Sequence, residues 1–307
     1  MSSTTALWGI DLGGTKIEGA IVDSAQRDRA LWRLRVPTES ERGYEHIISQ
    51  IRTLTERLES ESGLPRPRVI GFATPGTVEP ATGVMKNCNT VALNGRALRD
   101  DIASALGVEA RLANDANCFA LAESLLGAAR GRKVVVGLIL GTGVGGGIVV
   151  DGRVLQGLHG IAGEWGHNQM RGEHTPCYCG RNGCVETVIS GPALERLYCR
   201  LTGEPVRLEE IARRAARGEA AAVVTLERLR NKFGEAIAVV INIIDPDAIV
   251  IGGGVGNIDA LYDADTRQAV LRHLFNPVLR TEFLKPLLGD SAGVFGAALL
   301  TVPGPTP

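Results

Sequence analysis

The apolar positions of this chain alternate between a spacing typical of strands and one typical of helices. Short apolar runs occupy 7–12, 17–22 and 31–36, and the last run stops at Pro37. Runs of this length, bounded by turn residues, predict strands. Residues 44–58 instead carry Ile and Leu near the spacing of three to four that one helix face requires. The beginning of the chain therefore predicts three strands followed by a helix.

The same alternation continues to the end of the chain. Further strands are expected at 69–73, 110–113, 134–140 and 248–251, and helices at 96–106, 116–127, 192–201, 208–216, 220–244, 261–274 and 294–300. Strands that alternate with helices predict an α/β protein, and 307 residues are enough for roughly two domains.

One segment of the chain is echoed by another. Residues 9–23 read GIDLGGTKIEGAIVD, and residues 137–151 read GLILGTGVGGGIVVD, with six of fifteen positions identical. Both copies predict a strand, a glycine turn and a second strand. The echo favours two domains built on one plan, and the alternative is a chance likeness of two glycine-rich hairpins.

Composition and charge exclude several classes of partner. The chain has 33 basic and 34 acidic residues, and no run of five like charges, so a nucleic-acid surface is unsupported. The longest apolar runs are too short to cross a bilayer, and the first residues lack the features of a secretory signal. We expect a cytoplasmic protein without a nucleic-acid or membrane partner.

A dense group of metal-binding residue types lies between residues 163 and 186. It contains Cys177, Cys179 and Cys184, and two histidines, His167 and His174. Thiolates and imidazole suit zinc, and four such ligands give a closed tetrahedral site. A site with four protein ligands leaves no position for water, so the expected zinc is structural. The alternative is a set of inert buried cysteines or a disulfide.

The fourth zinc ligand is open between the two histidines. His174 is only three residues from Cys177, which makes a strained reach in a tight loop. His167 lies ten residues before Cys177 and allows an easier closure. Gly180 and Gly183 would let the backbone fold back so that the three sulfur atoms converge.

The first glycine hairpin has the residue types of a phosphate site. Gly13 and Gly14 allow backbone N–H groups to approach an anion, Thr15 adds a hydroxyl group, and Lys16 adds a positive charge. Asp11, at the end of the preceding strand, is suited to hold a hydrated Mg²⁺ ion. The alternative is an ordinary glycine-rich turn.

The second glycine hairpin matches the spacing G-x-G-x-x-G at residues 141–146. A dinucleotide fold requires a helix after these glycines, whereas a β-branched strand follows here, so that interpretation is rejected. No G-x-x-x-x-G-K-[ST] motif occurs, which also excludes a P-loop enzyme. We expect a second phosphate-contacting hairpin. The glycines at 252–254 would let a base or ribose pack on bare backbone, or else form a tight turn.

Polar residues follow two of the expected strands. Asn114 and Asp115 come after the strand at 110–113 and open a helix, so Asp115 is either a helix N-cap or a general base at a strand's carboxyl end. The segment from Thr74 to Thr77 and the later Asn87, Asn89, Thr90 and Asn94 form a polar loop region suited to hydroxyl ligands, or to ordinary turns.

Taken in order, these motifs resemble those of the ROK (repressor, open reading frame, kinase) sugar-kinase family. The segments that carry the resemblance are 11–16, 74–76, 114–117, 141–146, 163–167, 177–186 and 252–254. Within the family, LNG at 93–95, RLANDANC at 111–118 and the GEWGHN and PCYCG segments are most similar to bacterial fructokinases and mannokinases.

The resemblance implies an actin-like ATPase (ribonuclease H-like) fold of two α/β domains around a central cleft. We expect a smaller domain of residues 1–115 plus 291–307 and a larger domain of 116–290 that carries the zinc loop 163–186. The resemblance also implies ATP, Mg²⁺, a hexose hydroxyl as acceptor (expected to be O6) and a homodimer.

The roles of single residues follow from the same resemblance. Asp115 is the expected catalytic base, and the expected sugar ligands are Gly76, Thr90, Asn114, Asp115, Glu164, His167 and Glu186. The expected nucleotide ligands are Asp11, Gly13, Gly14, Thr15, Lys16, Gly141, Thr142, Gly143, Gly253 and Gly254, and the expected zinc ligands are His167, Cys177, Cys179 and Cys184. His167 would then serve twice, with one ring nitrogen on the metal and the other free to hydrogen-bond.

We therefore expect an ATP-dependent hexose kinase, with fructokinase (fructose or mannose) as the first interpretation. The alternatives are a glucokinase or an N-acetylhexosamine kinase of the same family. A sugar-binding regulator without catalysis is the alternative from another class. Only six residues precede the first expected strand, so we expect no DNA-binding helix–turn–helix domain.

Overall fold

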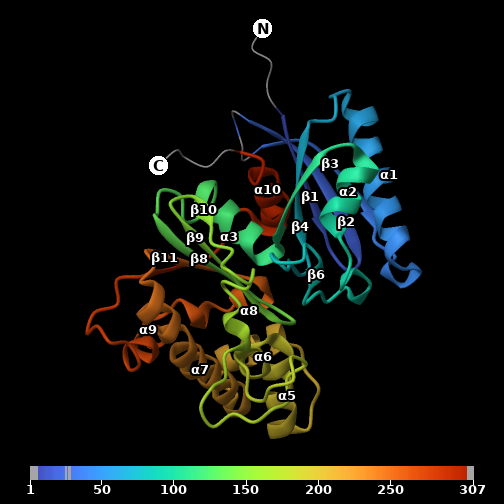
Figure 1. Cartoon of the computed structure of the whole chain (residues 1–307). Helices are drawn as coiled ribbons and strands as arrows, with labels where there is room; N and C mark the ends of the chain where they lie inside the picture. Colours follow the sequence, from blue (N-terminus) through green and yellow to red (C-terminus); the bar gives the residue numbers. More distant parts are fainter. Residues whose placement is uncertain (1–5, 25, 27–28, 303–307) are drawn as a thin grey trace. The chain divides into compact units, whose positions relative to one another are not determined.

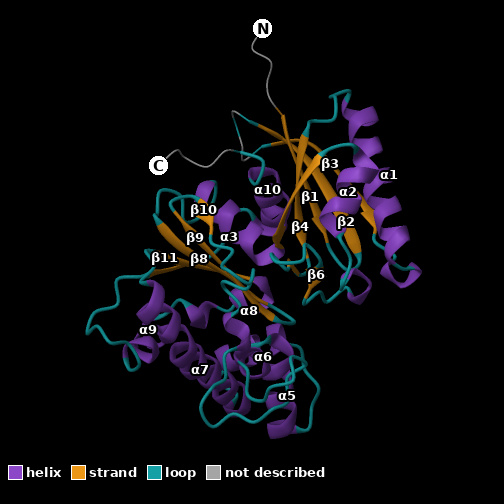
Figure 2. Cartoon of the chain, viewed as in Figure 1, coloured by secondary structure: helices purple, strands orange, loops and turns teal. Residues whose placement is uncertain are grey.

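The computed structural model describes residues 6–24, 26 and 29–302, which form the mixed α/β architecture that the sequence predicts (Figures 1 and 2). The chain folds into two compact units. Unit 1 consists of Met1–Arg130, Gly147–Ala162 and Leu288–Pro307, and unit 2 of Gly131–Gly146 and Gly163–Leu287.

The sheet of unit 1 combines an antiparallel hairpin with parallel strands. Its order is β3-β2-β1-β4-β7, with β1 (Ala6–Leu12), β2 (Lys16–Asp23), β3 (Ala30–Pro37), β4 (Val69–Thr74) and β7 (Glu109–Asn114). β1, β2 and β3 pair antiparallel, whereas β4 and β7 run parallel to β1. Because β1, β4 and β7 are parallel, their carboxyl ends lie at one edge of the sheet, where Asp11 and Asn114 are found.

The two faces of this sheet are covered by different helices. The apolar face packs on α1 (Tyr44–Ser62) and α2 (Leu98–Leu106), and the core here includes Trp8, Ile10 and Phe72. The other face packs on α10 (Ala292–Leu299), which lies beside α3 (Asp115–Leu125) (Figure 1). A Cβ on Gly9 or Gly71 would meet the α10 backbone at 2.3 or 1.8 Å, so glycine is required for this close approach.

The remaining elements of unit 1 are short. They are the 3₁₀ helices η1 (Ser40–Arg42), η2 (Val91–Leu93) and η5 (Gly289–Ser291), the paired strands β5 (Thr77–Val78) and β6 (Met85–Lys86), and β10 (Arg153–Val154). The segment of η1 and the loop before η2 both line the cavity described below.

A second five-stranded sheet has the order β10-β9-β8-β11-β12, with β8 (Val134–Leu140), β9 (Val144–Val150), β11 (Ala248–Gly252) and β12 (Glu282–Leu284). Ranked along the chain, its strands follow the same 3-2-1-4-5 order as those of the first sheet. The echoed segments at 9–23 and 137–151 occupy equivalent places in the two sheets. One plan is therefore used twice.

The helices of unit 2 are α4 (Val185–Ile189), α5 (Gly191–Thr202), α6 (Leu208–Ala216), α7 (Ala220–Ile244), α8 (Gly253–Gly256) and α9 (Ala264–Leu271), with the 3₁₀ turns η3 (Trp165–His167) and η4 (Asp259–Leu261). α7 has the predicted bounds, because Asp245 adopts a left-handed conformation (φ 48°) directly before Pro246. α9 begins later than predicted, because the Asp263 side chain accepts a hydrogen bond from Thr266 N and caps the helix there.

The compact units differ in their bounds from the expected domains of residues 1–115 plus 291–307 and 116–290. Helix α3 belongs to unit 1, together with α10. A Cβ on Gly296 in α10 would lie 1.9 Å from the Cys118 carbonyl oxygen in α3, so these two helices pack backbone against backbone. Residues 147–162 also belong to unit 1. Residues 288–307, which include α10, belong to unit 1 as well.

Candidate functional site

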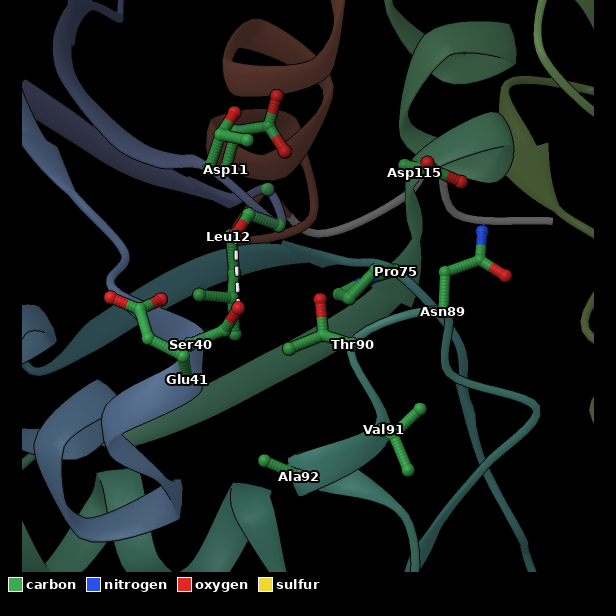
Figure 3. Close-up of a pocket in the computed structure, with 13 residues that line it drawn as sticks. Asp11, Leu12, Ser40, Glu41, Pro75, Asn89, Thr90, Val91, Ala92 and Asp115 are labelled. Atoms are coloured by element: carbon green, nitrogen blue, oxygen red, sulfur yellow. Dashed lines mark hydrogen bonds between the residues drawn. The ribbon is translucent and has the colours of Figure 1, made fainter.

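Unit 1 contains a cavity of about 630 Å³ at the carboxyl edge of its sheet (Figure 3). The lining residues come from five places: the end of β1 and its turn, the segment of η1, the residue after β4, the loop that leads into η2, and the start of α3. They include Asp11, Gly13, Gly14, Thr15, Ser40, Glu41, Pro75, Asn89, Thr90 and Asp115. The structure thus brings six of the predicted site residues, Asp11, Gly13, Gly14, Thr15, Thr90 and Asp115, to one cavity.

Asp115 is the first residue of α3, directly after β7. The N-cap of this helix is Asn114, whose Oδ1 accepts a hydrogen bond from Ala116 N at 2.9 Å. Asp115 Oδ1 accepts from the same N–H at 2.7 Å. Asn114 therefore takes the N-cap role that was the alternative for Asp115.

Asp11 is the last residue but one of β1 and lines the same cavity as Asp115. Burial, followed by the negative charges of Asp115 and Glu18, raises the pKa of Asp11 from 3.8 to about 7, and the positive charge of Lys16 opposes part of this shift. A Cβ on Gly293 would lie 2.6 Å from Asp11 Oδ2, so the glycine allows the start of α10 to approach the carboxylate. When two carboxyl groups lie in one concave site, one of them can accept a proton while the other binds a cation.

Three further predicted residues of unit 1 have local structural roles. Lys16 lies at the start of β2 with its Nζ 3.8 Å from Glu18 Oε2, and it is not among the described residues that line the cavity. Gly76 lies against β6, where a Cβ would meet Cys88 Sγ at 2.4 Å. Asn94, part of the polar loop region, closes that loop by accepting from Cys88 N at 2.9 Å.

In unit 2, one imidazole and three thiols converge. The ligand atoms of His167, Cys177, Cys179 and Cys184 all lie within 4.8 Å of one another. His167 Nδ1 is 3.7 Å from Cys177 Sγ, and Cys179 Sγ is 3.5 Å from Cys184 Sγ. Tetrahedral zinc with bonds of about 2.0–2.3 Å needs separations of about 3.5–3.8 Å between ligand atoms. The donor chemistry and these two separations therefore fit such an ion.

The loop that carries this cluster is shaped by its glycines. Gly180 and Gly183 have φ of 86° and 70°, the left-handed region that glycine tolerates best. Cys177 N donates to Arg181 O at 2.8 Å, which folds the loop back on itself. The exposed His174 is outside the group of four, so His167 is the histidine of the cluster.

Tyr178, which the sequence motifs did not single out, lies against His167. Its hydroxyl oxygen is 3.0 Å from His167 Nε2, and the two rings pack edge to face with centroids 5.2 Å apart. His167 Nε2, the ring nitrogen that the sequence left free to hydrogen-bond a sugar, therefore already lies within hydrogen-bond distance of Tyr178. The position of Tyr178 between two of the cysteines was the one available signal in the sequence.

Glu164 and Glu186 lie on either side of this cluster in the sequence. Burial raises the pKa of Glu164, while His167 opposes the shift and Glu186 adds to it. Glu186 Oε2 accepts a hydrogen bond from Val144 N at 3.0 Å, and a Cβ on Gly143 would lie 2.7 Å from the same oxygen. Glu186 therefore links the second glycine hairpin to the loop of the cluster.

The glycines of the second hairpin and of the turn at 252–254 differ in their surroundings. Gly143 and Gly146 permit close packing, since a Cβ on Gly146 would meet Trp165 Cδ1 at 2.8 Å. A Cβ added to Gly141 or to Gly254 would meet no heavy atom of the described residues within 4 Å, which leaves both glycines accessible to a ligand. The exposed Thr142 follows Gly141. As predicted, strand β9 rather than a helix follows this hairpin, so the rejection of a dinucleotide fold is confirmed.

The turn at 252–254 is held at both ends. Gly253 has φ 81° and would bring a Cβ within 2.3 Å of Leu140 O, so no other residue fits. The Tyr262 hydroxyl group donates to Gly256 O at 2.7 Å and also lies 3.1 Å from Ile251 O. Tyr262 is a second residue that the sequence motifs missed, because it lies several residues beyond the turn.

The fold and the site define a sugar-phosphorylating enzyme with an actin-like ATPase fold. The chain belongs to the ROK family, whose model matches residues 7–303. The comparisons thus confirm the family and the enzyme class that the motifs predicted.

Among the curated relatives of this chain are kinases of N-acetylated hexosamines. The N-acetyl-D-glucosamine kinase of Photobacterium profundum is 35% identical over 306 residues, covering 96% of this chain and 99% of the relative. The N-acetylgalactosamine kinase AgaK of Shewanella sp. (strain ANA-3) is 35% identical over 301 residues, covering 95% of this chain and 96% of the relative.

A solved structure agrees with the fold. A ROK family glucokinase from Streptomyces griseus in complex with glucose and AMPPNP superimposes with a TM-score of 0.78 at 28% identity, covering 96% of this chain and 98% of the other. Among the described residues of the present chain, no helix is both long and apolar enough to cross a membrane.

Proposed function

We propose that this ATP-dependent sugar kinase acts on an N-acetylhexosamine, with O6 as the phosphorylated position. The observation that carries the proposal is the 35% identity, over nearly the whole chain, to an N-acetylglucosamine kinase and an N-acetylgalactosamine kinase. The first interpretation of the sequence, a fructokinase, is therefore replaced by the alternative named beside it. The short LNG, RLANDANC and PCYCG segments are too few to distinguish substrates within the family.

Asp115 is the catalytic base in this proposal. A sugar hydroxyl group is a weak nucleophile, and its proton must leave as the oxygen bonds to phosphorus. A carboxylate at the start of α3, in the wall of the cavity, is suited to accept it. Thr90, Asn114, Glu164, His167 and Glu186 are proposed to hydrogen-bond the sugar, because carboxylate, amide and hydroxyl groups match hydroxyls that both donate and accept. Gly76 stays in this set as a prediction.

The nucleotide is proposed to bind through both glycine hairpins and the turn at 252–254. The proposed contacts are Gly13, Gly14, Thr15, Lys16, Gly141, Thr142, Gly143, Gly253 and Gly254. Backbone N–H groups at glycine turns bind phosphate oxygens without steric hindrance. The donor chemistry of Asp11 fits Mg²⁺, a hard cation that prefers carboxylate and water oxygens and that neutralises phosphate charge when bound.

Zinc is proposed to be structural. Four protein ligands leave no open position on a tetrahedral ion, so the ion would perform no chemistry. It would hold the loop between Glu164 and Glu186, and thereby the carboxylates at both ends of it. The homodimer and the cytoplasmic location remain predictions.

An ADP-release assay with purified protein and a panel of sugars tests the proposal. N-acetylglucosamine, N-acetylgalactosamine, N-acetylmannosamine, glucose, mannose and fructose are compared by kcat/KM. We expect one of the N-acetylated sugars to exceed fructose by at least tenfold. A preference for fructose would support the fructokinase interpretation instead. If no hexose leads to ADP release, the proposal that the protein is a sugar kinase is contradicted. Mass and NMR analysis of the product identifies the phosphorylated oxygen.

A further inference from the structure

The segment that follows β3 lies against the turn Gly13–Thr15. The Thr38 hydroxyl group donates to Gly13 O at 2.7 Å, and Thr38 N donates to Thr15 O at 3.0 Å. The Ser40 hydroxyl group donates to Gly14 O at 3.3 Å. All three carbonyl groups of the turn are thus held by two residues that lie more than 20 positions later in the chain.

These bonds also determine where the amide groups of the turn point. In a planar trans peptide the C=O and N–H groups point in opposite directions, and the described residues contain no cis peptide bond. Because Thr38 holds Gly13 O, the Gly14 N–H group of the same peptide points away from Thr38. Because Ser40 holds Gly14 O, the Thr15 N–H group points away from Ser40.

The two amide groups have no hydrogen-bond acceptor within the described part of the chain. Gly13 N donates to Lys16 O at 3.0 Å and so completes the hairpin, whereas no hydrogen bond from Gly14 N or Thr15 N is found within residues 6–24, 26 and 29–302. Gly14 and Thr15 both line the cavity, and a Cβ on Gly14 would meet only Thr90 Oγ1 among the described residues, in ordinary contact at 3.5 Å. Two adjacent N–H groups in a concave site are an anion-binding arrangement.

Such an arrangement needs an external support. Glycine peptides rotate readily, and a rotated Gly13–Gly14 peptide would present its carbonyl oxygen to an anion and repel it. Thr38 is fully buried (0% exposed), so its hydroxyl group has no water with which to exchange this bond. Preorganised donors of this kind lower the cost of reorganisation on binding.

We propose that Thr38 is a positioning residue that holds the Gly13–Gly14 peptide in the orientation that binds nucleotide phosphates, with Ser40 supporting the next peptide in the same way. The inference rests on the proposed role of this hairpin in ATP binding. It adds two residues outside every motif that the sequence revealed. Neither side chain needs to contact the nucleotide.

Calorimetric binding of AMPPNP with Mg²⁺ to the full chain tests the inference. Thr38→Val keeps the shape of the side chain and removes the hydroxyl group, and we expect the Kd for AMPPNP·Mg²⁺ to rise about tenfold while the KM for the sugar changes less than twofold. Thr38→Ser restores the hydroxyl group, and its Kd should lie within threefold of the wild-type value. An unchanged Kd in Thr38→Val overturns the inference, and so does a Thr38→Ser value as weak as that of Thr38→Val.

Thr55 offers a matched control. It is also 0% exposed, and its hydroxyl group donates to a backbone oxygen, Ile51 O, at 2.8 Å within α1. Thr55→Val should lower stability without changing the Kd for AMPPNP·Mg²⁺. A Kd raised as much as in Thr38→Val would mean that a general loss of stability explains the effect, which overturns the inference.

Ser40→Ala keeps the inference testable if Thr38→Val does not fold. Ser40 is only half-buried and its bond is longer, so we expect this variant to fold and its Kd to rise about threefold. An unchanged Kd in Ser40→Ala contradicts the proposal that Ser40 supports the second peptide.

If the wild-type protein binds AMPPNP·Mg²⁺ and releases no ADP with any sugar, the kinase proposal fails while the inference stands. If it binds no nucleotide, the inference is wrong.

Discussion

The hydroxyl oxygen of Tyr178 lies 3.0 Å from Nε2 of His167, while Nδ1 of the same ring lies 3.7 Å from Cys177 Sγ. A neutral imidazole that gives Nδ1 to a metal carries its proton on Nε2. His167 Nε2 would then donate to Tyr178 Oη, which in turn keeps its own proton available for donation. A sugar that takes the hydrogen bond of His167 must therefore displace Tyr178.

Replacing Tyr178 with Phe tests this competition. The Tyr178 side chain is exposed, so we expect little loss of stability and an unchanged metal content. Removal of the competing hydroxyl group should leave the KM for the sugar equal or lower it by up to about fivefold, since one hydrogen bond contributes about 1 kcal/mol. Steady-state kinetics and metal analysis measure both quantities.

Tyr44→Phe is the matched control, because the Tyr44 hydroxyl group bonds to Asp101 in the helical layer of unit 1. Its KM for the sugar should equal that of the wild-type protein. A KM raised more than threefold in Tyr178→Phe alone would make Tyr178 a sugar ligand rather than a competitor.

Asp115→Asn should remove phosphoryl transfer and retain sugar binding. The amide has the size of the carboxylate and can still hydrogen-bond, but it cannot accept the proton of the sugar hydroxyl group. General base catalysis contributes about 10²–10⁴-fold, so kcat should fall at least 100-fold. Sugar binding, measured by calorimetry, should weaken less than about fivefold.

Asp100→Asn, an exposed substitution on α2, serves as the control and should leave kcat unchanged. A turnover number in Asp115→Asn within a factor of three of the wild-type value would exclude Asp115 as the base.

The candidate site residues that the sequence motifs predicted all lie in short local segments. The hairpin around Gly13, the Asn114–Asp115 step and the cysteine cluster are local motifs, and the structure places each at a strand end or in a glycine-shaped loop. Strands of two or three residues, such as β5, β6 and β12, were missed because so few residues show no period.

The sequence motifs could not predict contacts between residues that are far apart in the chain. Thr38 meets Gly13 only because β3 pairs with β2, and Tyr262 meets Ile251 only after the chain turns back through η4. The choice between His167 and His174 likewise depended on loop closure, to which η3 and the turn at Gly180 contribute. Spacing along the chain does not determine such contacts, because they depend on which elements pack together.

Asp11 should make the stability of the metal-free protein depend on pH. Burial, followed by the charges of Asp115 and Glu18, raises the pKa of Asp11 from 3.8 to about 7. Between these values the folded protein keeps a proton that the unfolded chain has released, so the free energy of unfolding falls as the pH rises. The contribution is fully present below pH 3.8, and its loss by pH 7 amounts to about 4 kcal/mol at most.

Urea unfolding in the presence of a chelator measures this dependence. Because other groups also titrate, the informative quantity is the free energy of unfolding of Asp11→Asn minus that of the wild-type protein. This difference should increase between pH 5 and pH 8, since the variant does not ionise at this position. The difference for Asp100→Asn should stay constant, and a constant difference for Asp11→Asn as well would show that Asp11 has an ordinary pKa.

Loss of the proposed zinc ion should loosen the loop between Glu164 and Glu186 and weaken sugar binding more than nucleotide binding. Cys184 is fully buried, and its sulfur is one of the four convergent ligand atoms. Cys184→Ser should therefore reduce zinc stoichiometry from one per chain to near zero. A loss of about 3 kcal/mol would lower Tm by about 6–12 °C for a domain of this size.

Cys199→Ser is the matched control, because Cys199 is a half-buried cysteine on α5 outside the cluster. It should keep its zinc and its KM for the sugar. In Cys184→Ser the KM for the sugar should rise at least tenfold, because the loop that carries Glu164 and Glu186 is no longer held, whereas the Kd for AMPPNP·Mg²⁺ should change less than threefold. A protein that contains no zinc when purified from zinc-supplemented medium, or a variant with both constants unchanged, would contradict the structural role of the ion.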